Sequence, residues 1–491
     1  METALEIAAA VRRGEVSAVE VTTAALKRAE RIGPAVGAFV ELTPELALAQ
    51  ARGVDEAVAR GDGGDGITGL ELAGVPIPVK DLNQVAGVPL RAGSRVLAVQ
   101  PIVPEVDDGT VVRLRDAGSV MIGKTATPEF GFPPYTEPRT GPDGAIVAAR
   151  TPWDLRRGAG GSSGGAAAAV AAGIVPVAHA SDGGGSIRIP AASCGIVGFK
   201  PSRGLVSTGP WGVDGNGLAT QGVVSRTVLD TALALDVLGR GWPGDGPRAG
   251  TGGLLTAALD GDDVGAVRGL RVGILTTPVV AGDAVVHPEA VAAAERAART
   301  LEAGGAVVEH APVPFTPQEW LTFMPLWSVG ALTLPVPDEA EELLEPLTRW
   351  LREVGRSVSG ADYARAVADA QRVARQVATA WDAFDVVVTP SLAGPPAVVG
   401  SIRNDVDPAR DFEDQKRFTP WTSIANIAGV PSVSLPVHRA VLDGVELPFG
   451  AMLTGRLGQD GALLAVARHL ELADPWPAPP SLIRAPTPAA D

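Results

Sequence analysis

The stretch "ASDGGGSIRIPA", residues 180–191, places three consecutive glycines directly before a serine. Ordering a glycine costs more backbone entropy than ordering any other residue, so a run of three needs a physical reason. Glycine has no side chain to hold a neighbouring group away, and it adopts backbone angles that strain other residues. The run therefore indicates that backbone N–H groups around Ser186 approach something closely. On its own, the pattern is equally typical of a flexible turn.

Composition and charge narrow the classes of function. The chain has 491 residues, enough to bury a sizeable core, and a formal net charge of −15. That charge disfavours nucleic acid and anionic membranes as partners. The single cysteine, Cys194, cannot form an internal disulfide, which fits a reducing compartment and predicts a cytoplasmic protein. Residues 1–20 lack the pattern of a signal peptide, and the Ala-rich run 164–180 is too short to span a bilayer.

The periodicity of the chain predicts alternating helices and strands. Apolar positions three and four residues apart predict helices within residues 1–60 and at 110–118. Short runs rich in β-branched residues predict strands at 72–82, 119–125, 270–277, 305–313, 384–392 and 430–437. The alternation indicates a layered α/β domain.

Two segments depart from this alternation. Residues 239–268 are rich in Gly, Pro and Asp, which predicts a surface connection. Residues 314–383 have a mostly helical pattern and carry four tryptophans among acidic residues. We interpret this second segment as a helical cap over one face of the sheet.

One stretch of the chain matches a phosphate-binding motif by chance. Residues 118–125, "GSVMIGKT", fit the phosphate-loop pattern G-x-x-x-x-G-K-[ST]. A phosphate loop needs a helix that begins at the lysine, but Pro128 follows four residues later and the residues between the glycines are strand formers. We therefore exclude this motif.

A second motif, "GGSSGG" at 160–165, matches the nucleophile elbow G-x-S-x-G on either of its serines. An elbow serine needs a histidine and an acid. Of the five histidines, His438 and His469 lie late enough in the chain for the usual order. His179 lies in an apolar run typical of a buried imidazole. A Ser-His-Asp hydrolase therefore stays open. No Cys pair or H-x-x-x-H spacing indicates a metal site, and we expect neither a metal nor an organic cofactor.

A lysine is the other group that can activate a serine, either directly or through a second hydroxyl. Lys80 follows the apolar run "GVPIPV" (74–79), where burial would lower the pKa of its amine. An isolated lysine at a strand end is also typical of the protein surface, so the position alone does not decide its role.

Three stretches together are more specific. "GVPIPVKD" (74–81), "GGSSGG" (160–165) and "SDGGGSIRIPA" (181–191) resemble the amidase signature family of serine hydrolases. The similarity is strong over residues 65–235 and weaker in the C-terminal third. It extends through 92–97, 117–130, 151–173 and 193–207, and resumes at 421–436 and 463–471.

The resemblance implies α/β/α layers, with a central mixed, twisted β-sheet flanked by helices and a mostly helical cap. It also implies a single domain spanning 1–491. The expected parts are N-terminal helices (1–65), a signature core (66–240), its continuation (241–313), the cap (314–383) and the C-terminal part of the core (384–491).

The resemblance further implies a Ser–cis-Ser–Lys triad. Ser186 would be the nucleophile, and Ser162, preceded by a cis peptide bond, would relay its proton to a neutral Lys80. Ser163 would support this network, although the doublet leaves open which of the two serines is the relay.

The resemblance also implies a reason for the three glycines before Ser186. The N–H groups of Gly183, Gly184, Gly185 and Ser186 would bind the oxyanion of a tetrahedral intermediate. Asp182 and Arg188 flank the turn and are expected to hold its shape.

The expected substrate pocket is apolar and aromatic. Its candidate residues are Phe130, Tyr135, Phe323, Met324 and Trp327. They predict small hydrophobic or aryl amides as substrates. The chain also resembles the subgroup that includes nylon-oligomer hydrolases and urethanases, so carbamates and esters are further candidates. We expect a monomer or a homodimer.

Two rival functions remain. A glutamine-dependent amidotransferase subunit would need partner chains, and the acidic charge disfavours its direct contact with tRNA. A non-catalytic binding protein on the same scaffold would not need Lys80, Ser162 and Ser186 together.

Overall fold

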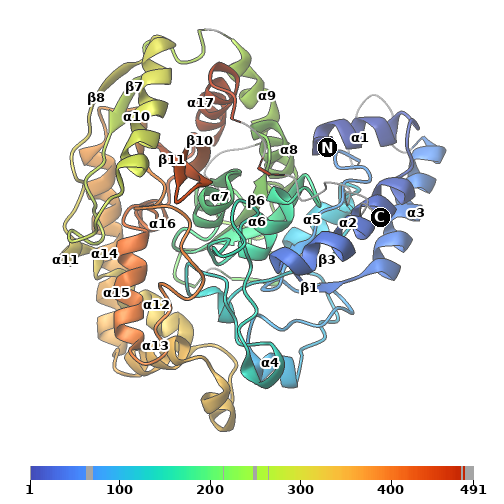
Figure 1. Cartoon of the computed structure of the whole chain (residues 1–491), viewed down its shortest axis with the longest axis horizontal. Coiled ribbons are helices and arrows are strands. Elements are labelled where there is room, and N and C mark those ends of the chain that lie inside the picture. Colours follow the sequence, from blue (N-terminus) through green and yellow to red (C-terminus); the bar gives the residue numbers. More distant parts are fainter. Residues whose placement is uncertain are drawn as a thin grey trace.

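The computed structural model describes residues 2–61, 70–213, 215–246, 252–263, 265–476 and 479–480. The predicted boundary at residues 65 and 66, and parts of the predicted connection 239–268, lie outside these ranges. The described part contains a large mixed β-sheet, a small second sheet and many helices (Figure 1).

The large sheet has eight strands within the described ranges, in the order β4-β6-β5-β10-β11-β9-β7-β8. Neighbours are antiparallel from β4 to β9, whereas β9, β7 and β8 run parallel. The bounds are β4 (Val177–Asp182), β5 (Val197–Lys200), β6 (Thr220–Ser225), β7 (Arg271–Ile274), β8 (Val307–His310), β9 (Val386–Pro390), β10 (Ser432–Leu442) and β11 (Val445–Gly455). Of the four predicted strands from residue 270 onward, three contain β7, β8 and β9, and the fourth, 430–437, covers the first part of β10. The predicted α/β fold with a central mixed sheet is thus confirmed.

The small sheet brings the chain around Lys80 to the large one. Its strands are β1 (Phe39–Leu42), β2 (Val79–Lys80) and β3 (Gly123–Thr125), in the order β1-β3-β2. The N–H of His179, in β4, donates to the carbonyl of Pro78 just before β2, at 3.0 Å. Lys80 therefore lies beside the end of β4.

Helices cover both faces of the large sheet. Successive strand residues point to opposite faces. In β11, Met452 belongs to the aromatic core of the cap, whereas Ala451 and Leu453 belong to the main core with the helices of the other side. The helices packed on the sheet are α6 (Gly164–Ala171), α7 (Arg188–Cys194), α8 (Val228–Leu238), α10 (Pro288–Ala303) and α17 (Asp460–Ala473), and α9 (Leu254–Leu259) packs on α8 and α17.

The N-terminal helices lie at one end of the molecule, on the right of Figure 1. They are α1 (Ala4–Arg12), α2 (Ala18–Val36) and α3 (Pro44–Arg60). Later in the chain, α5 (Gly109–Asp116) packs on α8, and the short helix α4 (Arg95–Val99) lies at the bottom of Figure 1. Capping boxes begin α1 at Thr3 and α2 at Ser17, where Glu6 and Glu20 satisfy the backbone N–H of the capping residue. Across the described residues, no helix combines the length and hydropathy needed to cross a membrane.

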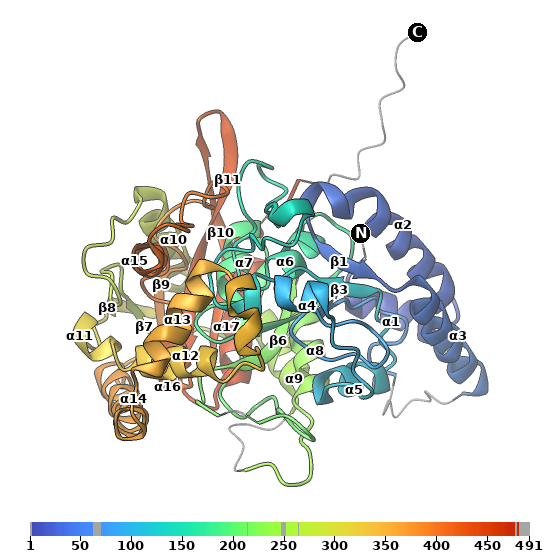
Figure 2. The same cartoon turned by 90° about the horizontal axis from the view of Figure 1, so that it is seen from below.

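The predicted cap is helical and lies at the other end (Figure 2). It contains α11 (Pro317–Trp320), α12 (Phe323–Leu332), α13 (Pro346–Arg356) and α14 (Gly360–Ala380). Two later helices, α15 (Pro408–Phe418) and α16 (Ile424–Ala428), pack with the cap in one aromatic cluster. This cluster covers the end of the sheet where the glycine turn follows β4, and so it forms the wall of the site.

Candidate active site

Lys80 is the centre of the site. Its side chain is fully buried at the end of β2. Its Nζ lies 2.8 Å from Oγ of Ser162, 2.9 Å from Oγ of Ser163 and 3.1 Å from Oγ of Ser181. The structure thus brings Lys80 to the serine doublet, Ser162 and Ser163, more than 80 residues later in the chain. It adds Ser181, whose contact the sequence analysis did not predict.

The burial of Lys80 changes its protonation. Burial lowers the pKa of its amine to about 7, against an opposing effect of the Asp182 charge. Near neutral pH a large share of Lys80 is therefore uncharged. An uncharged amine has two N–H donors and one lone pair. It can therefore donate two hydrogen bonds to its hydroxyl neighbours and accept one from a third.

The backbone around Lys80 is held by buried groups. The Lys80 N–H donates to Nδ1 of His179 at 3.4 Å. Burial, with the charge of Lys80, lowers the pKa of His179 to about 3, so this ring is a neutral acceptor. On the other side, Asp81 forms a fully buried ion pair with Lys124 at 2.8 Å. Lys124 also donates to the carbonyl of Asn83. These contacts fix the position of the amine.

The two serines of the doublet differ in their hydrogen bonds. The Gly161–Ser162 peptide bond is cis. The Ser163 hydroxyl donates to the carbonyl of Ser181 at 3.2 Å, so its oxygen faces Lys80 as an acceptor. That leaves Ser162 as the member of the doublet with a proton free to donate to the amine. These hydrogen bonds favour Ser162 over Ser163 as the candidate for the relay, a choice that the sequence left open.

The glycine turn between β4 and α7 is organised by Asp182. Its carboxylate accepts from the N–H of Gly185 at 2.8 Å and of Ile187 at 3.1 Å. It also forms a fully buried ion pair with Arg188, at 3.0 Å, and accepts from the amide of Asn426 at 2.8 Å. Burial alone would raise the pKa of Asp182, but the charge and hydrogen bonds of these partners lower it to about 2. The expected role of Asp182 and Arg188 in shaping the turn matches these contacts.

The expected set of oxyanion donors needs one correction. The N–H of Gly185 is already donated to Asp182, so it is not available to a substrate. The N–H groups of Gly183, Gly184 and Ser186 donate to no residue within the described ranges. These three groups are the remaining candidates.

Gly183 and Gly185 have no room for a side chain, each because of a different neighbour. Gly185 has φ of +135°, and a Cβ there would lie 2.6 Å from both Ile189 and Thr422. A Cβ on Gly183 would lie 3.1 Å from the ring of Trp327. Side chains at these positions would displace the turn or the cap.

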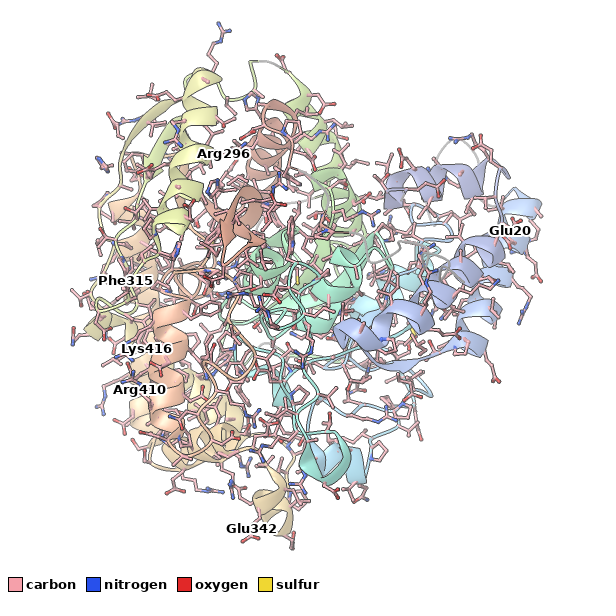
Figure 3. The ribbon with its side chains drawn as sticks, viewed as in Figure 1. Glu20, Arg296, Phe315, Glu342, Arg410 and Lys416 are labelled. Atoms are coloured by element: carbon pink, nitrogen blue, oxygen red, sulfur yellow. The ribbon has the colours of Figure 1, made fainter. Side chains whose placement is uncertain are left out.

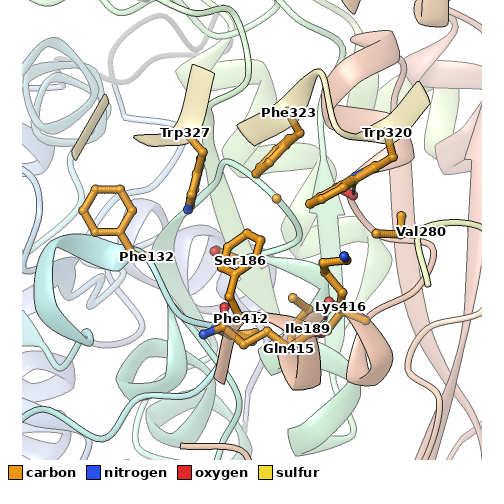
Figure 4. A pocket seen from close by; sticks show the side chains of 14 residues that line it. Phe132, Ser186, Ile189, Val280, Trp320, Phe323, Trp327, Phe412, Gln415 and Lys416 are labelled. Atoms are coloured by element: carbon orange, nitrogen blue, oxygen red, sulfur yellow. Dashed lines mark hydrogen bonds between the residues drawn. The ribbon is translucent and has the colours of Figure 1, made fainter. Parts of the chain in front are cut away.

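A narrow cavity of about 60 Å³ lies in front of Ser186 (Figure 4). Trp320, Phe323 and Trp327 form a continuous wall, with neighbouring ring centroids 5.0 Å apart. Figure 4 shows Phe412 and Gln415 on the opposite side. The remaining lining residues are Phe132, Pro134, Gly184, Ile189, Val280, Lys416, Thr419 and Ser423.

Three of the predicted pocket residues are absent from this described lining. Phe323 and Trp327 line the cavity, but Phe130, Tyr135 and Met324 do not. Tyr135 is buried, and its hydroxyl donates to Asp411 of α15 at 2.7 Å. Met324 packs into the aromatic core of the cap. Phe130 has φ of +49°, and the following turn presents Phe132 to the cavity instead.

The histidines lie elsewhere, although all five are in the described ranges. None is among the residues that line the cavity. His438 pairs with Glu289 at 2.6 Å, between β10 and α10. His469 is buried in α17. No described residue set forms a cluster of three or more metal-binding side chains.

Comparison with known proteins identifies the class. The family model described as amidase matches residues 20–464. A putative amidase of Synechocystis sp. is 35% identical over 95% of this chain and 88% of its own length. The 6-aminohexanoate-cyclic-dimer hydrolase of Paenarthrobacter ureafaciens is 33% identical over 95% and 93%. A solved structure of 6-aminohexanoate cyclic dimer hydrolase superposes with a TM-score of 0.86 at 29% identity, covering 97% of both chains.

These matches define an amidase-signature amidohydrolase, an enzyme that acts on carbon–nitrogen bonds. The chain belongs to the amidase family, which confirms the resemblance found in the sequence.

Proposed function

We propose that this protein hydrolyses small amides through an acyl-enzyme on Ser186, with Ser162 as proton relay and Lys80 as base. The observation that carries the proposal is the fully buried Lys80 amine, 2.8 Å from the Ser162 hydroxyl and with its pKa lowered to about 7 by burial. A buried lysine that is partly neutral at physiological pH is suited to general base catalysis.

In the first step, Oγ of Ser186 attacks the carbonyl carbon of the substrate. The Ser186 proton passes to Ser162, and the Ser162 proton passes to the lone pair of Lys80. The carbonyl oxygen becomes an oxyanion, which the N–H groups of Gly183, Gly184 and Ser186 would bind. Each such donor contributes about 3–4 kcal/mol to the stability of the transition state.

In the second step, the proton on Lys80 returns through Ser162 to the nitrogen of the leaving amine. The C–N bond breaks and leaves an ester between the acyl group and Ser186. Water then attacks this ester, giving its proton to the same relay. The relay returns that proton to Ser186, which restores the enzyme and releases the acid.

The pocket supports a substrate with a slender apolar part. Its volume of about 60 Å³ is small beside the roughly 300–1,000 Å³ of cavities that bury larger ligands. One relative is named as a hydrolase of the cyclic dimer of 6-aminohexanoate. We therefore propose amides of small unbranched or aryl groups as substrates, with carbamates and esters as further candidates because they present the same carbonyl.

The test is hydrolysis of a small panel by the purified protein. The panel contains a p-nitroanilide, a p-nitrophenyl carbamate, a linear oligoamide of 6-aminohexanoate and glutamine. Activity on the first three that is lost in Ser186→Ala and Lys80→Ala supports the proposal and ranks the substrates. Activity on glutamine alone would point to an amidotransferase subunit. Activity that survives Lys80→Ala but not His438→Ala would replace the lysine mechanism by a histidine one.

A further inference from the structure

One charged side chain lines the otherwise neutral cavity in front of Ser186. Among the described lining residues, only Lys416 of α15 carries a charge. Figure 4 places it toward the end formed by Trp320 and Val280, away from Phe132 at the other end. A lysine in an aromatic cavity needs an explanation, because charged groups are rarely removed from water without a partner.

Lys416 is held in place from the solvent side. Its Nζ donates to both carboxylate oxygens of Glu413 at 2.8 Å, and it lies 5.4 Å from the ring centre of Trp320. The Lys416 side chain is only 13% exposed, whereas that of Glu413 is 47% exposed. Arg410, six residues earlier in α15 (Figure 3), is 57% exposed and pairs with Asp414 along the helix surface. Unlike Arg410, Lys416 is therefore directed inward.

Several polar side chains that line the cavity with Lys416 make hydrogen bonds within the protein. The Ser423 hydroxyl accepts from the indole N–H of Trp320 at 2.8 Å, and the Thr419 hydroxyl donates to the carbonyl of Gln415 at 2.9 Å. The Gln415 amide donates to Asp411 at 2.6 Å. Lys416 has three N–H donors, and Glu413 takes the two that its oxygens can accept. One donor remains for a group that enters the cavity.

We infer that the cavity selects amide substrates that carry a carboxylate at the end of a short, slender chain, and that Lys416 binds this carboxylate. The inference rests on the proposed function, because it assigns the substrate class of the Ser186 site. A carboxylate and an ammonium form a short, charge-assisted hydrogen bond, and the aromatic walls exclude water from it. The narrow cavity admits a chain of methylene groups between this carboxylate and the scissile carbonyl.

The test uses matched substrates that differ only at the chain end. One pair consists of p-nitroanilides whose acyl chains end in a carboxylate or in a methyl group. The second pair consists of hexanoyl amides of 6-aminohexanoate and of hexylamine. We expect kcat/KM of the wild-type enzyme to be at least about tenfold higher for the carboxylate member of one pair, and this preference to persist at moderate salt because a water-excluded ion pair is screened only weakly. The pair that shows the effect identifies which half of the substrate lies against Lys416.

Three variants assign the effect to Lys416. Lys416→Met is expected to remove the preference for the carboxylate, mainly through a higher KM. Glu413→Gln is expected to increase it, because it leaves Lys416 without a competing carboxylate. Lys27→Met, at an exposed lysine of α2, is the matched control and leaves the preference unchanged. A preference that persists in Lys416→Met, or no preference in either pair, overturns the inference.

Binding separates this inference from the proposed function. In the Ser186→Ala background, calorimetry is expected to give a Kd for the carboxylate substrate that rises at least about tenfold when Lys416→Met is added. Turnover of the methyl substrates without a carboxylate preference would refute the role of Lys416 and leave the Ser186 mechanism in place. Lys416-dependent binding in a protein that turns over no amide would refute the mechanism instead.

Discussion

The amine of Lys80 and the hydroxyl of Ser162 lie 2.8 Å apart, although 82 residues separate them in the chain. Lys80 ends the short strand β2, and Ser162 precedes α6 at a cis peptide bond. Their contact depends on the packing of β2 against β4, so the fold itself brings together the two groups that we propose as base and proton relay. This contact predicts a particular pH dependence and different roles for the two serines of the doublet.

The first consequence is a pH profile set by Lys80. Its lowered pKa of about 7 means that the required neutral form is scarce below this pH and predominant above it. We therefore expect kcat/KM to rise about tenfold per pH unit below pH 7 and to level off above about pH 8. Steady-state rates from pH 5 to 10 on a neutral p-nitroanilide provide the measurement. A maximum well below neutrality would show that Lys80 is not the base.

The second consequence separates the two serines of the doublet. Ser162→Ala removes the proton relay, and we expect kcat to fall about 10²–10⁴-fold. Ser163→Ala removes a hydroxyl that already donates to the Ser181 carbonyl, so its expected loss is smaller, about tenfold. Rapid-mixing measurement of the acylation step on a p-nitrophenyl ester compares the two variants. Equal losses, or a larger loss in Ser163→Ala, would reverse the roles given to them here.

A third prediction concerns the ion pair beneath the glycine turn. Arg188 and Asp182 are both fully buried, and removing one partner leaves an unpaired charge in the core. We expect Arg188→Met to lower the free energy of unfolding by about 3–5 kcal/mol. Urea unfolding followed by circular dichroism provides the measurement.

The matched control is Arg410→Met, at the exposed pair with Asp414, where the expected change is below about 1 kcal/mol. If Arg188→Met gives no soluble protein, Arg188→Lys keeps the charge, loses the two-point contact with Asp182 and should unfold at lower urea than the wild type. Equal stability of the wild type, Arg188→Lys and Arg188→Met would contradict the role of the pair.

The sequence predicts which residues lie around Lys80 better than it predicts the walls of the cavity. The motifs around Lys80, Ser162 and Ser186 are short and continuous in the sequence. Each can therefore be recognised from its own residues, without knowledge of the fold. The contact of Ser181 with Lys80 depends on the packing of β2 against β4, two strands of different sheets, which no local pattern encodes. The strand β4 itself is a buried, Ala-containing run without polar alternation, so periodicity does not reveal it.

The residues that line the pocket are also hard to predict from local sequence patterns. Tyr135 looks like a wall residue because it is aromatic, yet its hydroxyl needs a partner and finds it in Asp411. Conversely, Phe412 and Lys416 lie in a segment, "PARDFEDQKRF" (408–418), whose charges are typical of a surface helix. Only the packing of α15 against the cap turns these two side chains toward Ser186.

The last prediction tests why the turn is made of glycine. An alanine at Gly185 would have to keep φ of +135° and would place its Cβ 2.6 Å from Thr422. At Gly184, the added Cβ would lie 3.6 Å from Phe323, which is an ordinary contact. We therefore expect Gly185→Ala to cost about 1–3 kcal/mol of stability and to lower kcat/KM at least about 100-fold, because the turn also carries Ser186. Gly184→Ala should unfold at nearly the wild-type urea concentration. Labelling of Ser186 by a fluorophosphonate, compared with the unfolding midpoint, separates a displaced nucleophile from an unfolded protein. Normal labelling and stability in Gly185→Ala would mean that the turn does not require glycine at this position.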